Sequence, residues 1–118
     1  MKAFILDVDG VLTDGKMWYT KDGKVMKAFG ADDNDALKML KEYIHIEFVS
    51  GDYNGFEISK KRVEDMGFKI TLVQGVEERT EWVKRRWFIE EVIYMGDSFM
   101  DASLLKRVGY GVCPANGS

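Results

Sequence analysis

Hydrophobic and polar positions follow two periods along the chain, and they predict a succession of strands and helices. Short apolar runs bounded by glycine or acidic residues predict strands, whereas apolar residues three or four positions apart predict helices. The predicted strands cover residues 2–8, 44–49, 69–73, 92–95 and 110–113. The predicted helices cover residues 33–43, 55–66, 77–87 and 101–108. This alternation favours parallel crossovers, so we expect a single α/β domain over residues 1–118, Rossmann-like and three-layered, with a mostly parallel sheet.

A β-hairpin insertion is predicted after the first strand, over about residues 16–29. Two short strands, residues 16–20 and 24–29, flank an Asp22-Gly23 turn signal. A two-stranded ribbon is marginally stable alone in water, and this one carries Trp18 and Tyr19. The hairpin either packs on its own domain or pairs with copies of itself. We favour the second alternative because exposed apolar patches usually mark interaction sites.

The first predicted strand ends on two aspartates, Asp7 and Asp9. A buried carboxylate is costly unless a cation or hydrogen-bond donors compensate for lost hydration. Side chains alternate along a strand, so these two would share a face, where they suit a hard cation such as Mg²⁺. The alternative is a solvated Asp-Gly turn after the strand.

A second acidic cluster, Asp97 and Asp101, follows the strand at residues 92–95. Open α/β sheets bind ligands beyond the carboxyl ends of their strands. If the two strands are neighbours, Asp97 joins Asp7 and Asp9 in one pocket. Asp101 begins a predicted helix, so a helix N-cap is the alternative to a functional role.

Composition narrows the class of protein. The 118 residues carry a net charge of −3, with 46% hydrophobic and 31% charged residues, which is typical of a globular domain. We therefore expect no nucleic-acid and no membrane partner. The one cysteine, Cys113, excludes an intrachain disulfide and fits a reducing compartment. No signal peptide or membrane-spanning stretch is predicted, so we expect a cytoplasmic location.

Three motifs in order resemble those of the haloacid dehalogenase-like phosphohydrolases. They are Asp-Val-Asp-Gly-Val-Leu-Thr-Asp-Gly at residues 7–15, Ser50-Gly51 after a strand, and Gly-Asp-Ser-Phe-Met-Asp at residues 96–101. The hairpin and residues 29–40, 74–76 and 104–109 narrow the resemblance. They are similar to the capless branch that contains 3-deoxy-D-manno-octulosonate 8-phosphate phosphatase and nonulosonate 9-phosphate phosphatases. The resemblance covers essentially the whole chain.

The resemblance implies a catalytic role for each acid. Asp7 would be the nucleophile that forms an aspartyl-phosphate. Asp9 would act as general acid and then as general base. Mg²⁺ would be held by Asp7, by the backbone carbonyl of Asp9 and by Asp97, with Asp101 in support.

The resemblance also implies how the substrate phosphate is bound. Ser50 would donate a hydrogen bond to the phosphoryl oxygens, together with the backbone N–H groups of Gly51 and Gly10. The alternative for Ser50 is a strand-end hydroxyl that satisfies a turn.

The chain departs from the family pattern in three places. Arg79 stands where the family has a lysine that neutralises the phosphate and the nucleophile, so Arg79 would take that catalytic role, or Lys84, the nearest lysine, would bind the substrate phosphate; Arg and Lys differ in reach. Asp52 stands where relatives commonly have a basic residue that meets a substrate carboxylate. The chain ends at Ser118, where relatives continue, so the C-terminal part of the family fold is expected to be absent. The region of Asp32, Asp33, Asn34 and Asp35 is also more acidic than the family pattern, which would weaken the binding of an anionic substrate.

We therefore expect a Mg²⁺-dependent phosphatase of a small phosphate ester, a sugar or sugar acid phosphate, assembled as a homotetramer. One alternative is a phosphatase for a different ester; another is a weak or inactive homologue that acts as a binding or scaffold protein. His45 is read as a core or edge residue. Residues 84–86 are predicted to form a solvated helix face. The aromatic residues beside them, Trp82, Trp87 and Phe88, are predicted to pack within the helix and the following loop.

Overall fold

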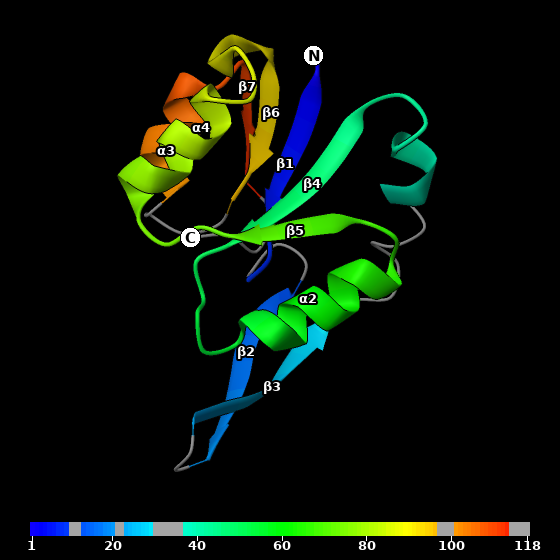
Figure 1. Cartoon of the computed structure of the whole chain (residues 1–118), viewed down its shortest axis with the longest axis vertical. Coiled ribbons are helices and arrows are strands. Elements are labelled where there is room, and N and C mark those ends of the chain that lie inside the picture. Colours follow the sequence, from blue (N-terminus) through cyan, green and yellow to red (C-terminus); the bar gives the residue numbers. More distant parts are fainter. Residues whose placement is uncertain (10–12, 21–22, 30–36, 97–100, 114–118) are drawn as a thin grey trace.

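A five-stranded parallel sheet forms the centre of the structure, a computed structural model that describes residues 1–9, 13–20, 23–29, 37–96 and 101–113 (Figure 1). Residues 13–20 and 23–29 are described by their backbone alone. The strands of this sheet are β1 (Ala3–Asp7), β4 (His45–Ser50), β5 (Lys69–Leu72), β6 (Val92–Met95) and β7 (Tyr110–Val112). Their order is β5-β4-β1-β6-β7, and every neighbouring pair is parallel. The predicted α/β fold class is confirmed.

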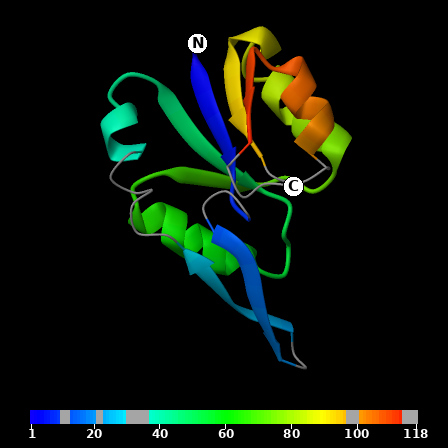
Figure 2. The same cartoon turned by 180° about the vertical axis from the view of Figure 1, so that it is seen from behind.

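Helices cover both faces of the sheet and complete three layers (Figures 1 and 2). Helix α2 (Phe56–Asp65) lies on one face, and α3 (Val76–Lys84) and α4 (Ala102–Arg107) lie on the other. Gly67 follows α2 with a φ of 87°, a conformation that glycine adopts without strain, as the predicted helix end requires. None of the helices in the described residues is long and apolar enough to span a membrane.

Two predicted helices differ in extent from those observed. The predicted helix at 77–87 ends at Lys84, because the chain then turns into the short 3₁₀ helix η1 (Ile89–Glu91). Of the predicted helix at 33–43, residues 37–40 are helical and residues 33–36 lie outside the described part of the chain. Leu37 is buried, but Leu40 and Tyr43 are exposed, so the apolar spacing there does not translate into packing.

The core is divided by the sheet into two clusters, as alternation along β1 requires. Leu6 faces α2, in a cluster with Phe48, Val63 and Met66. Ala3 and Ile5 face the opposite side. The second cluster also contains Val83 of α3, Leu104 of α4, Val92 and Tyr94 of β6, Val49 and Val108. Asp7 has the same parity in β1 as Ala3 and Ile5, which directs its side chain to the α3–α4 face.

The predicted hairpin is present as a separate two-stranded antiparallel sheet. Strands β2 (Thr13–Thr20) and β3 (Gly23–Phe29) pair with each other, and β2 begins three residues earlier than predicted. Figures 1 and 2 show the hairpin next to α2, extending away from the main sheet. The turn residues Lys21 and Asp22 lie outside the described residues.

Candidate active site

Strand order brings the ends of β1 and β6 together. Leu6 pairs with Met95 in the parallel register, so Asp7 and Gly96 occupy the next level at the carboxyl edge. Strands β4 and β5 lie on one side of β1, and β6 and β7 on the other, which makes this edge the topological switch point where such sheets bind ligands. The neighbouring strand ends required by the sequence hypothesis are confirmed. Asp97, which follows Gly96, lies outside the described residues.

Asp7 and Asp101 meet at this edge with one cation, Arg79. Arg79 Nη1 lies 2.9 Å from Asp101 Oδ1 and 3.6 Å from Asp7 Oδ2. Asp101 is 1% exposed and Asp7 is 8% exposed. Asp101 occupies the N-cap position of α4, but its side chain makes no capping hydrogen bond. The helix-cap alternative therefore does not describe what this carboxylate does.

Burial and the crowding of acids dominate the electrostatics of the site. Burial raises the pKa of Asp7 to about 8; Arg79 opposes the rise and Asp101 adds to it. The backbone N–H of Val8 donates to Asp7 Oδ1 at 2.8 Å and favours the charged form. Burial also raises the pKa of the Tyr94 hydroxyl well above its ordinary value, so this group stays protonated.

Oxygen ligands for a hard cation are present, although the described residues hold only part of a set. Within residues 1–9, 37–96 and 101–113, no group of three or more acidic, histidine or cysteine side chains forms a complete metal site. Asp7 and Asp101 supply carboxylates, and Asp9, half-buried, follows β1. Mg²⁺ would relieve the crowding of the buried Asp7 and Asp101 carboxylates, which together with burial raises the pKa of Asp7, so the donor set fits this ion.

The residues expected to bind phosphate lie at the same edge, at the end of β4. Asp7 pairs with Val49 in the register, which puts Ser50 one level further along. Ser50 is fully buried, and its Oγ accepts a hydrogen bond from the Asp52 N–H at 3.2 Å, as the turn alternative requires. Gly51 lies against Arg79, since a Cβ on Gly51 would be 2.9 Å from Arg79 Nη2. Gly10 lies outside the described residues.

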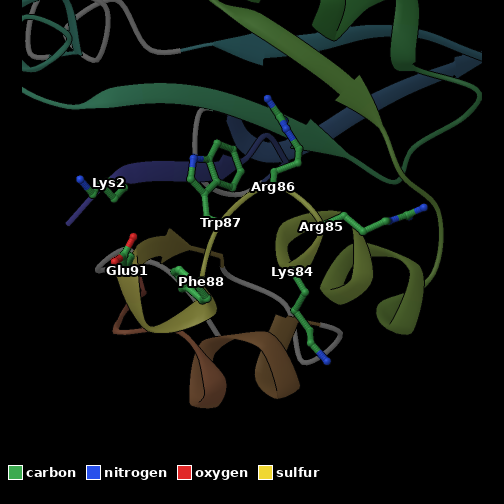
Figure 3. A pocket seen from close by; sticks show the side chains of 7 residues that line it. All are labelled: Lys2, Lys84, Arg85, Arg86, Trp87, Phe88 and Glu91. Carbon is green, nitrogen blue, oxygen red and sulfur yellow. The ribbon is translucent and has the colours of Figure 1, made fainter.

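The structure corrects the expectation for Lys84. Five residues along an α-helix rotate a side chain by about 140°, so Lys84 does not share the face of Arg79. Lys84 Nζ lies 3.7 Å from Glu81 Oε1 and lines a pocket of about 560 Å³ at the opposite end of β1 (Figure 3). This rear pocket is lined by Lys2, Lys84, Arg85, Arg86, Trp87, Phe88 and Glu91. Figure 3 shows Lys84, Arg85 and Arg86 pointing in different directions, so they do not converge on one ligand.

Sequence reasoning also missed an ion pair between Arg86, which lines that pocket, and the buried Glu47. Arg86 is exposed, as expected of a solvated face, but its guanidinium also makes two hydrogen bonds to Glu47, which is 1% exposed in the middle of β4. The guanidinium stacks 4.5 Å from the Trp87 ring centroid and 4.9 Å from that of Trp82. His45 is an exposed residue at the start of β4, with its Nε2 2.7 Å from Glu47 Oε1, and its non-catalytic role stays a prediction. The signal that could have revealed this pair was a glutamate inside an apolar strand, because a buried glutamate usually has a charged partner.

Tyr94 is the site residue that the sequence pattern did not reveal. It was read only as part of a strand, but its hydroxyl is buried beside Arg79 and Asp101. The signal was a tyrosine near the carboxyl end of a core strand, because a buried phenol needs a polar partner.

We compared the chain with protein-family models, with curated proteins and with solved structures. No family model matches the chain. It is 33% identical over 114 aligned positions to the 3-deoxy-D-manno-octulosonate 8-phosphate phosphatase of Haemophilus influenzae, covering 92% of this chain and 62% of that protein. The chain thus spans less than two thirds of the length of this curated relative.

Solved structures match over the full chain. The same-named phosphatase of Moraxella catarrhalis, in complex with magnesium, phosphate and KDO, is 27% identical with a TM-score of 0.84, covering 100% of this chain and 70% of that one. A hydrolase of the HAD superfamily, subfamily III A, from Legionella pneumophila is 28% identical with a TM-score of 0.84, covering 100% and 66%. In sequence and fold, the chain is similar to hydrolases of the haloacid dehalogenase-like superfamily and, among them, to 3-deoxy-D-manno-octulosonate 8-phosphate phosphatases.

Proposed function

We propose that this protein is a Mg²⁺-dependent phosphomonoesterase for a small phosphorylated metabolite, a sugar or sugar acid phosphate. One observation carries the proposal: two buried carboxylates, Asp7 and Asp101, meet a buried arginine at the switch point of the sheet. The relationship to sugar acid phosphatases supports it.

Asp7 is the proposed nucleophile. One of its carboxylate oxygens attacks phosphorus, and the bond from phosphorus to the leaving alkoxide breaks as the aspartyl-phosphate forms. Asp9 gives a proton to the alkoxide, then takes one from the water that attacks the intermediate and releases inorganic phosphate. Asp9 follows Asp7 by two residues and is half-buried.

The proposed ion would be held by Asp7, the backbone carbonyl of Asp9, Asp97 and Asp101. Bound there, Mg²⁺ would neutralise charge between the nucleophile and the phosphate. Arg79 adds a fixed positive charge, since burial alone would lower its pKa but the adjacent Tyr94 and Asp7 raise it. This charge stabilises the phosphoryl oxygens as they approach Asp7.

Hydrogen-bond donors at the end of β4 would orient the phosphate. Ser50 and the backbone N–H groups of Gly51 and Gly10 take this role in the proposal. Asp52 adjoins them and is half-buried. An acid at this position disfavours a nearby substrate carboxylate, so neutral sugar phosphates are candidates alongside sugar acid phosphates.

A panel of phosphate esters, assayed with Mg²⁺, tests the proposal. We expect release of inorganic phosphate from at least one sugar or sugar acid phosphate, and no release after chelation of the metal. If folded protein leaves the whole panel intact, the catalytic proposal fails and a binding or scaffold role replaces it. Cytoplasmic location remains an expectation from the sequence.

A homotetramer is the proposed assembly, with hairpins β2–β3 covering neighbouring sites. The hairpin extends away from the main sheet, as an assembly element would (Figure 1). Light scattering on the purified protein should give four times the 13.5 kDa chain mass. A mass equal to one chain would contradict this assembly.

Gly96→Ala should reduce turnover strongly because it displaces Asp101. A Cβ on Gly96 would lie 2.6 Å from Asp101 Cγ, too close for both to stay in place, and Asp101 is 1% exposed. Misplacing a site group by about 1 Å can cost about a hundredfold in rate, which is the loss in kcat we expect. Ser103→Ala, at an exposed position of α4, is the matched control and should retain full activity. Unchanged turnover in Gly96→Ala would remove Asp101 from the mechanism.

Mg²⁺ should stabilise the protein more at pH 8 than at pH 5. The pKa of Asp7 is about 8 in the metal-free folded state and 3.8 in the reference state. Between these values the folded state holds a proton that the unfolded chain has lost, so metal-free stability falls as the pH rises. A bound cation replaces that proton, and we expect Mg²⁺ to raise Tm by about 5 °C or more at pH 8.

The Asp7→Asn variant isolates this effect. Its stability should change less between pH 5 and pH 8 than that of the wild type, because the titrating group is gone. An equal pH dependence in both proteins would show that Asp7 is not the group that titrates.

A further inference from the structure

Tyr94 lies beneath the candidate site and contacts both charged groups beside Asp7. Its side chain is fully buried in β6. The hydroxyl donates to Asp101 Oδ1 at 2.6 Å and accepts from Arg79 Nη1 at 2.9 Å. Arg79 Nη1 also donates to Asp101 Oδ1 at 2.9 Å. The three side chains therefore form a closed triangle of hydrogen bonds.

The guanidinium of Arg79 depends on this triangle for its orientation. Arginine has five N–H donors, two of them on Nη1, and here those two serve Tyr94 and Asp101. Among the described residues, Nη2 makes only a long contact, 3.4 Å, to the Val73 carbonyl. Within the described residues Nε is buried without a hydrogen-bond partner. Losing the phenol would thus release one of the two close contacts that fix the group.

An alternative acceptor lies within reach of the released donor. Asp7 Oδ2 is 3.6 Å from Arg79 Nη1, beyond normal hydrogen-bond distance. A small rotation of the guanidinium would turn this approach into a direct, charge-assisted hydrogen bond, which is among the stronger kinds in proteins. A carboxylate oxygen engaged in that way has less electron density to offer phosphorus.

We propose that Tyr94 is a positioning residue that holds Arg79 against Asp101 and away from a direct hydrogen bond to Asp7. Arg79 then provides charge to the site without occupying the attacking oxygen. The consequence for turnover rests on the proposed function, in which Asp7 is the nucleophile. The restraint on the orientation of Arg79 is independent of the proposed function.

Kinetics of Tyr94→Phe test the consequence. The variant should lose about tenfold in kcat, the size of one hydrogen bond to a charged group, with KM changed less than about threefold. In an Arg79→Lys background, Tyr94→Phe should change kcat less than about twofold, because a lysine ammonium has no planar guanidinium to reorient. Tyr43→Phe, at a tyrosine that is 84% exposed, is the control and should match the wild type.

The double-variant comparison separates positioning from structure. A merely structural loss would appear equally in the wild-type and Arg79→Lys backgrounds, and that result would overturn the proposal. Wild-type turnover in Tyr94→Phe would overturn it too, while leaving the phosphatase assignment intact.

A spectroscopic measurement tests the restraint even if no ester is hydrolysed. The Arg79 guanidinium signals in a 15N spectrum, identified by their loss in Arg79→Lys, should show separate Nη resonances in the wild type. In Tyr94→Phe these resonances should broaden or shift as the guanidinium reorients. Identical Arg79 signals in both proteins would refute the positioning role, independently of whether the protein is an enzyme.

Discussion

Asp7→Asn should lower phosphate release by at least about a thousandfold while the protein remains folded. The amide keeps the shape of the carboxylate but cannot attack phosphorus, and no aspartyl-phosphate can form. Asp7 is almost fully buried at the end of β1, and burial together with Asp101 raises its pKa to about 8. The neutral amide removes that electrostatic cost, so Tm of the metal-free variant at pH 8 should not fall below that of the wild type.

Two controls make this result specific. Asp65→Asn changes an exposed acid that pairs with Lys61 on α2 and should leave turnover unchanged. Mass spectrometry of acid-quenched wild-type protein should find phosphate on the peptide containing Asp7, and Asp7→Asn should lack it. Full activity in Asp7→Asn would mean that another residue performs the attack.

Arg86→Met should destabilise the fold by about 3 kcal/mol, the largest stability effect we expect. Removing Arg86, whose side chain is 30% exposed, leaves the buried Glu47 carboxylate, only 1% exposed, without its guanidinium partner. His45 still contacts Glu47, which places the cost at the lower end of the usual range. Urea unfolding at pH 7 measures it. Arg85→Met, next in sequence and exposed, should change stability by less than about 0.5 kcal/mol.

The structure also predicts how the stability difference between the wild type and Arg86→Met depends on pH. Burial would raise the pKa of Glu47, but hydrogen bonds from Arg86 and His45 outweigh it and hold the pKa below its usual value. The stabilisation is therefore present above about pH 4.5 and is lost as the pH falls through the folded-state pKa. The gap between wild type and Arg86→Met should narrow in acid. Replacing both residues, as in Glu47→Leu with Arg86→Met, should cost less than Arg86→Met alone.

Alternation and motif order were sufficient to predict the sheet, because each strand is a short apolar run between clear turn signals. The neighbouring position of β1 and β6 also followed from the hypothesis that Asp7 shares a pocket with the acids after β6. What periodicity does not encode is which long polar side chain reaches across elements. Arg86 looked like one more cation on a solvated surface, yet its guanidinium lies over two indole rings and pairs with the buried Glu47.

Tyr94 and Lys84 also show that the sequence pattern predicts the element in which a residue lies but not the partners of its side chain. The strand pattern placed Tyr94 in an apolar strand but gave no partner for its hydroxyl, which the packing of α3 and the start of α4 against β6 supplies. Lys84 was a candidate by distance along the chain, whereas the rotation of α3 directs it to the far end of the sheet. Asp97 and Gly10 remain predictions because they lie outside the described residues.

A crystal structure with Mg²⁺ and vanadate is the most direct measurement of the central claim that Asp7, Asp101 and Arg79 form a phosphoryl-transfer site. We expect vanadium beside an Asp7 carboxylate oxygen, the metal bound between the ends of β1 and β6, and Arg79 facing the vanadate. Vanadate bound elsewhere, with no metal at the ends of β1 and β6, would contradict the account.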